Sequence, residues 1–85
     1  MMKRTKRIRK IIEKNFIDFD ISVTDDSITH KGHNNFDGKE ETHIIIELKK
    51  KYNLKINRLE THKKINNLLF EEFKIGLHAL QIKII

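Results

Sequence analysis

The order of apolar and polar positions along this 85-residue chain predicts two helices and three strands. From roughly Lys3 to Asn15, apolar side chains recur every three or four residues, which is typical of one face of an amphipathic helix. These positions are Ile8, Ile11, Ile12 and Phe16. The next segment, Ile17 to Thr24, alternates between apolar and polar residues and predicts a half-buried strand. Its inward positions are Ile17, Phe19, Ile21 and Val23.

The second half of the chain repeats the two periodicities. Residues Thr42 to Leu48 predict a second strand, with Ile44, Ile46 and Leu48 on the buried face. Asn57 and Glu60 form a candidate cap for a second helix. The apolar face of that helix consists of Ile65, Leu68, Leu69 and Phe73. Gly76 then provides the left-handed conformation that ends a helix at low cost.

A third strand follows Gly76 and begins with a histidine. Because strand side chains alternate between faces, Leu80, Ile82 and Ile84 share one face with His78. The element order is therefore helix, strand, strand, helix, strand. The first two strands should pair antiparallel, and the third should lie parallel to the second after a right-handed crossover. We predict one α+β domain over residues 1–85, with a three-stranded mixed sheet and helices on one face.

This topology brings histidines to one edge of the sheet. His30 and His33 lie in the long connection from Asp25 to Glu41, His43 opens the second strand and His78 opens the third. Two or three neutral imidazoles at one edge could bind a borderline metal. In the alternative that stays open, His78 is bonded to a backbone carbonyl and the loop histidines are solvated.

The fifth histidine, His62, belongs at the opposite end. The helix that carries it begins there and runs back towards the histidine edge. His62 is in register with Ile65 and Leu69, which predicts a packed, structural histidine whose ring nitrogen fixes a loop.

The amino-acid composition limits the kinds of site that this chain can form. The chain has no cysteine, which excludes disulfides, thiol catalysis and a self-contained zinc finger or iron–sulfur centre. A soft metal would need histidines, or thiolates from a partner. The sequence contains no glycine-rich phosphate loop and no recognisable nucleophile–base pattern, so we predict that the protein is not an enzyme.

Charge and hydropathy bear on partners and location. The formal net charge is +6, and six basic residues fall within the first ten positions. Such a segment attracts nucleic acid or an acidic protein surface, although a solvated basic helix end is the simpler interpretation. No apolar run is long enough to span a bilayer, and the first residues lack the apolar core of a secretory signal. We therefore expect an intracellular protein, cytoplasmic or mitochondrial, that is not secreted and has no membrane contact.

Four segments together resemble the BolA-like proteins in order and spacing: DDSITHKGH, ETHIIIEL, THKKINNLLFEEF and GLHALQIKI. The resemblance runs from about Ile8 to Ile85. It implies a helix–strand–strand–helix–strand fold similar to a type II KH module. The chain departs from the family at Thr61 to Lys63, where an R-H-R stretch is usual, and at Tyr52 to Leu54, which lacks the usual glycine turn.

The resemblance also implies a function. BolA-like proteins pair with monothiol glutaredoxins and share a [2Fe–2S] cluster with them, in iron–sulfur cluster trafficking or iron regulation. The glutaredoxin supplies a cysteine and a bound glutathione thiolate. The BolA-like ligands fall on His78 and, in the loop, on His30, with His33 as a substitute; the loop-side assignment stays open among His30, His33 and His43. The isolated chain is expected to be a monomer without a cofactor.

Two other functions compete with this one. Some BolA-like proteins are described as transcriptional regulators, and the KH-like fold suggests nucleic-acid binding. The G-x-x-G loop with which KH domains clamp the nucleic-acid backbone is missing here, which leaves weak electrostatic binding. A stand-alone zinc or copper site at the histidine edge is the other candidate, and imidazoles on a loop would make it a low-affinity one.

Overall fold

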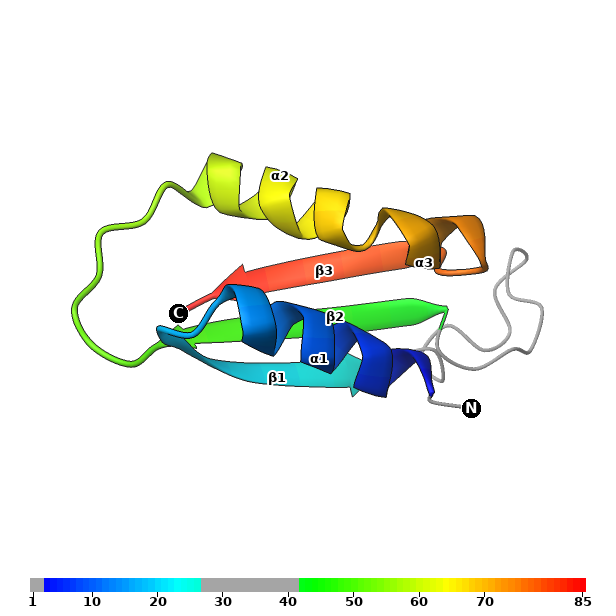
Figure 1. The fold of residues 1–85 in the computed structure, drawn as a ribbon, viewed down its shortest axis with the longest axis horizontal. Coiled ribbons are helices and arrows are strands. Elements are labelled where there is room, and N and C mark those ends of the chain that lie inside the picture. The colour runs from blue at the N-terminus through cyan, green and yellow to red at the C-terminus, as the bar shows by residue number, and fades with distance from the viewer. Residues whose placement is uncertain (1–2, 27–41) are drawn as a thin grey trace.

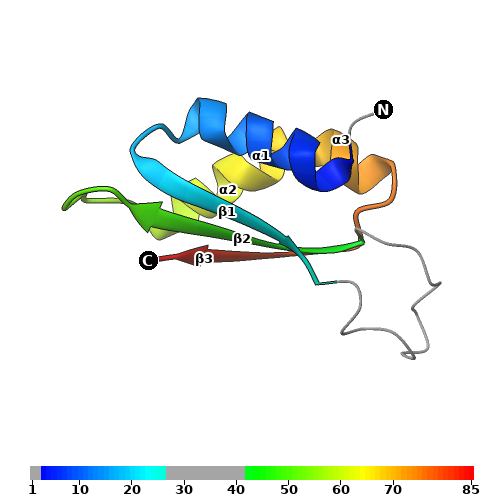
Figure 2. The same cartoon turned by 90° about the horizontal axis from the view of Figure 1, so that it is seen from below.

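The computed structural model describes residues 3–26 and 42–85, and it has the predicted α+β order. Its elements are α1 (Arg4–Asn15), β1 (Phe19–Asp25), β2 (His43–Lys50), α2 (Arg58–Leu68), α3 (Phe70–Lys74) and β3 (Ala79–Ile84). The strands form one layer and the helices lie on a single face of it, as Figure 2 shows. Among these helices, none has the length and apolar character needed to cross a membrane.

The sheet has the order β1-β2-β3, so β2 is the central strand (Figure 1). Strand β1 pairs antiparallel with β2, and Val23 lies opposite Ile46. Strand β3 pairs parallel with β2, and Ile46 lies opposite Ile82. Both predicted strand directions are confirmed. Strand β2 ends two residues later than predicted, because Lys50 pairs with Phe19 and its N–H donates to the carbonyl of Ile85.

The core lies between the helices and β2. Its fully buried side chains are Ile8, Ile12, Ile44, Ile46, Leu48, Ile65 and Leu69. These residues are the apolar stripe of each long helix and every second position of the central strand. The periodicities that predicted the elements therefore also predicted which residues bury apolar surface, the main favourable contribution to folding.

The start of the first strand differs from the prediction. Ile17 was expected to face inward, yet it precedes β1 and is 72% exposed. The Phe19 N–H donates to the Phe16 carbonyl at 3.2 Å, which closes a turn with Ile17 at its tip. The rings of Phe16 and Phe19 meet edge to face at 6.0 Å between centroids. The aromatic pair packs across this turn, and the strand begins at Phe19, which lies opposite Lys50.

The second helical segment begins at its predicted cap and is interrupted once. The Asn57 side chain accepts a hydrogen bond from the Glu60 N–H at 3.1 Å. The predicted continuous helix is broken at Leu69, which separates α2 from α3 and has φ −100° and ψ 12°. Gly76 has φ +125°, a conformation that side chains rarely adopt, and it ends the segment as predicted.

Asn57→Ala should lower the free energy of unfolding by about 1 kcal/mol, because the first turn of α2 would lose its side-chain acceptor. Urea unfolding followed by circular dichroism measures the change. Asn67→Ala is the matched control: it removes an exposed asparagine from the last turn of the same helix, away from the cap, where alanine is the better helix former. An equal loss in both variants would contradict the capping role.

Candidate functional site

The end of β1 and the starts of β2 and β3 meet at one edge of the sheet, as the topology predicted (Figure 1). Asp25 lies opposite Ile44, and His43 lies opposite Ala79. Two of the predicted histidines come together there. The rings of His43 and His78 have their centroids 5.3 Å apart and their planes inclined at 55°. This pair of imidazoles is the nucleus of the candidate site.

Main-chain hydrogen bonds hold both histidines in place. The carbonyl of Thr42 accepts from the N–H of His78 at 2.8 Å and from the N–H of Ala79 at 3.0 Å. Thr42 is itself buried, and its Oγ1 lies 3.0 Å from Nδ1 of His43. A hydroxyl can donate or accept, so this contact restricts the orientation of the His43 ring in either tautomer.

The surroundings of His78 differ from the prediction. His78 was expected on the apolar face of the third strand, but β3 begins one residue later and the His78 side chain is exposed. Leu77 is the residue that is buried here. The reason is that His78 belongs to the connection from the helix layer to the sheet, where strand alternation does not yet apply. The exposed His78 ring is therefore accessible to a group that another molecule carries.

The long connection leaves and rejoins the sheet at this edge. The N–H of Asp26 donates to the carbonyl of His43 at 2.7 Å, so the chain is still at the site where the connection starts. His30 and His33 lie outside the described residues. Within residues 3–26 and 42–85, no three histidine or acidic side chains are grouped so that they could hold a metal ion. The described part of the edge offers two imidazoles.

His62 lies on α2, which begins at the other end of the sheet, and its side chain is half-buried. Its ring makes no hydrogen bond to any other residue that the structure describes. Its carbonyl accepts from Asn66 at 2.8 Å. The structural role of His62 in fixing a loop stays a prediction.

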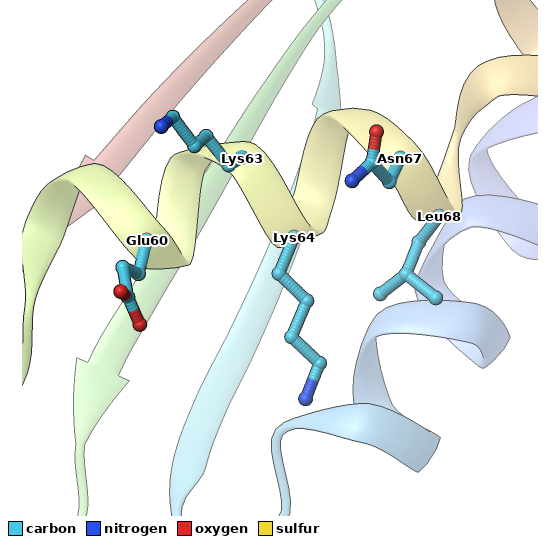
Figure 3. Close-up of a pocket in the computed structure, with 5 residues that line it drawn as sticks. All are labelled: Glu60, Lys63, Lys64, Asn67 and Leu68. Atoms are coloured by element: carbon cyan, nitrogen blue, oxygen red, sulfur yellow. The ribbon is translucent and has the colours of Figure 1, made fainter.

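A shallow depression of about 450 Å³ lies along α2, away from the histidines. Figure 3 shows Lys63 and Lys64 extending from different sides of the helix, with Glu60 one turn away. The Nζ of Lys64 lies 5.0 Å from the centroid of the Phe16 ring. Two lysines beside a carboxylate make a surface of mixed charge.

A buried acidic residue near the site was missed by the sequence analysis. Glu72 is 6% exposed and accepts hydrogen bonds from two arginines of α1. The distances are 3.0 Å from Arg4 Nε to Oε1, 2.8 Å from Arg7 Nε to Oε2 and 2.9 Å from Arg7 Nη2 to Oε1. The prediction that the basic residues of the first helix lie in solvent was wrong for Arg4, whose side chain is 12% exposed, and it holds only in part for Arg7, which is 35% exposed.

The missed signal is the position of Glu72 on its helical segment. Glu72 follows Ile65 by seven residues and Leu69 by three, which places a carboxylate on the buried stripe. A buried charge requires a partner of opposite sign. The hydrogen bonds from Arg7, and then those from Arg4, hold the pKa of Glu72 below its usual value, against the opposing effect of burial.

The geometry defines an α+β domain with a three-stranded mixed sheet, helices on one face and two histidines at the edge where β1 ends and β2 and β3 start. The family model described as BolA-like protein matches residues 12–85, and the chain belongs to the BolA-like family. The resemblance seen in the sequence is thereby confirmed.

Relatives and solved structures agree with this assignment. The chain is 32% identical over 81 residues to "Protein BOLA1, chloroplastic" of Arabidopsis thaliana, covering 93% of this chain and 51% of that protein. It therefore spans about half the length of that relative. It is also 32% identical to an uncharacterized Sinorhizobium protein in the cobS 5′ region, covering 96% and 89% of the two chains. The BolA domain of SufE1 from Arabidopsis thaliana superposes with a TM-score of 0.78 at 32% identity, covering 99% of this chain and 92% of that one. BolA1 from the same plant gives 0.77 at 30% identity, with the same coverage.

Proposed function

We propose that this protein is a non-enzymatic adaptor that binds a monothiol glutaredoxin and co-ligates a shared [2Fe–2S] cluster, in iron–sulfur cluster trafficking or iron regulation. The observation that carries the proposal is the pair His43 and His78, whose rings lie 5.3 Å apart at the edge where three strand ends meet. Family membership supports it.

The histidines of this chain can supply half of the ligands of such a cluster. A [2Fe–2S] cluster is held by four ligands, usually thiolates, and imidazoles can replace two of them on one iron. This chain has no cysteine, so it can contribute imidazoles only, and a partner must supply the thiolates. When bound, the cluster would supply electron storage and a transferable iron–sulfur unit. Replacing thiolate by neutral imidazole raises the reduction potential of the cluster.

Within this chain, His78 is the first proposed ligand because its exposed ring is accessible to a partner. His30 is the proposed second ligand, carried by the connection that starts at the same edge, with His33 as its substitute. His43 is the third candidate for this position, supported by its ring contact with His78 and by the Thr42 hydroxyl beside its Nδ1.

The proposal is tested by mixing the protein with a monothiol glutaredoxin homodimer that carries a [2Fe–2S] cluster and glutathione. Visible circular dichroism should change until one protein is bound per glutaredoxin. His78→Ala should abolish this change, and His62→Ala, from the other end of the domain, should retain it. Single alanine variants of His30, His33 and His43 then identify the second ligand. An unchanged spectrum with the wild-type protein would refute the proposal.

Nucleic-acid binding is the alternative function. The depression along α2 offers Lys63 and Lys64, but Glu60 shares it and reduces the local positive charge (Figure 3). Fluorescence anisotropy with labelled DNA across a salt series would show a steep loss of affinity if contacts are made only to phosphates. A sequence-selective affinity that resists salt would favour this alternative over the cluster adaptor.

A further inference from the structure

The turn that presents His78 is held from the other end of the chain. Arg4 and Arg7 of α1 form ion pairs with the buried carboxylate of Glu72, which lies on α3 just before the turn. These residues are 65 and 68 positions apart in sequence. Hydrogen bonds between charged groups are stronger than neutral ones, and both oxygens of Glu72 are engaged. The three side chains therefore connect α1 rigidly to the end of α3.

The same residues also bind the main chain of the turn. Arg4 Nη2 donates to the carbonyl of Ile75 at 2.9 Å. The carbonyl of Glu72 accepts the N–H of Leu77, also at 2.9 Å. A Cβ atom at Gly76 would lie 3.1 Å from Arg4 Nη2, so the guanidinium packs directly against the turn. Residues 75 to 77 are thus held by contacts to both members of the Arg4–Glu72 pair.

His78 follows this turn directly. Its own N–H donates to Thr42, and its side chain is exposed. Apart from its contact with the His43 ring, this exposed imidazole has little packing to set its position, so the ring position depends largely on the main chain that carries it. The turn formed by Ile75, Gly76 and Leu77, together with the Thr42 carbonyl that accepts the His78 N–H, therefore sets the position of His78.

We propose that Arg4, Arg7 and Glu72 form a clamp that positions His78 for ligation. The clamp acts through the main chain of residues 75–77, so these are positioning residues. Arg4 and Arg7 precede residue 12, where the match to the family model begins, so the clamp includes residues outside the matched region. Its functional meaning rests on the proposed function, because it presupposes that His78 binds the shared cluster.

Amide hydrogen exchange on the full chain tests the clamp without any cluster. In Glu72→Gln, which keeps the shape of the side chain but loses its charge, the N–H groups of Leu77, His78 and Ala79 should exchange about tenfold faster or more. This factor is measured relative to the amides that pair β1 with β2. Arg4→Lys keeps the charge but loses the forked donor to Ile75, and it should give an intermediate increase.

Two control variants separate positioning from stability. Glu71→Gln removes the neighbouring carboxylate, whose side chain is 79% exposed, and should leave exchange at the turn unchanged. Ile12→Val weakens the core from the same helix as the two arginines and should accelerate the turn and the sheet by one common factor. If Glu72→Gln also accelerates both by one common factor, the clamp is only a stabilising ion pair and the proposal is overturned.

Titration into the cluster-loaded glutaredoxin provides the second readout. Glu72→Gln should require several-fold more protein than wild type to reach half of the spectral change, whereas Ile12→Val should match wild type. Equal midpoints for wild type and Glu72→Gln would overturn the positioning role while leaving the proposed function intact. If wild type itself gives no change, the proposed function fails, and the link from the clamp to ligation fails with it. The exchange experiment still decides whether the clamp holds the turn.

Discussion

Glu72→Ala should lower the free energy of unfolding by about 2–3 kcal/mol. Removing one partner of a buried ion pair typically costs about 3–5 kcal/mol, because the remaining charge stays buried without compensation. The expected loss is smaller here because the Arg7 side chain is 35% exposed and water screens its charge. Against a total stability of about 5–15 kcal/mol, the loss is large enough to measure by urea unfolding.

Glu71→Ala is the matched control for this substitution. It removes the same chemical group from the adjacent position, where the carboxylate is exposed and lies 3.9 Å from Lys74. Exposed pairs of this kind contribute about 0–1 kcal/mol. Equal losses in the two variants would contradict a stabilising role for the buried pair.

The contribution of Glu72 should depend on pH in a defined direction. Its pKa in the folded protein is lowered from the usual 4.5, chiefly by the hydrogen bonds from Arg7. A lowered pKa in the folded state means that the contribution is complete above about pH 4.5 and is lost as pH falls through the folded-state pKa. The difference in stability between wild type and Glu72→Gln should be constant near neutral pH and shrink in acid. A difference that grows with acidity would contradict this assignment.

Ile46→Ala should have the largest effect on stability, about 3–4 kcal/mol. Ile46 lies at the centre of the middle strand and has no exposed surface, so truncation leaves a cavity that the packed neighbours cannot fill. Urea unfolding again measures the loss, and the change in midpoint should occur without a large change in slope.

The neighbouring residue provides the control for Ile46. Ile45 lies on the other face of β2 and is only partly buried, so Ile45→Ala should cost about 1 kcal/mol, mainly through lost strand preference. Two equal losses would mean that β2 does not have one buried face. The comparison therefore tests the register of the central strand, because a shift of one residue would exchange the two faces.

The sequence was sufficient for the elements, the strand directions and most of the core. Helical and extended backbones repeat every 3.6 and 2 residues, and burial on one side turns these repeats into visible apolar patterns. The same local reasoning located Asn57 as a cap and Gly76 as a helix end, because both roles depend on backbone geometry within one turn. It also predicted the edge where His43 and His78 meet, because the ends of paired strands follow from topology.

Only the tertiary structure decided which charged residues pair and which side chains are covered. Arg4 and Glu72 are 68 residues apart, and their contact depends on how α1 packs beside α3 above the sheet. A separation of 68 residues is far longer than the helical and strand repeats, so the sequence pattern could not indicate this contact. The exposure of Ile17 and of His78 has the same origin, because each lies in a connection between layers, where strand alternation does not hold. Periodicity determined the faces of regular elements, and packing between elements determined the ion pairs and the positions of residues in the turns.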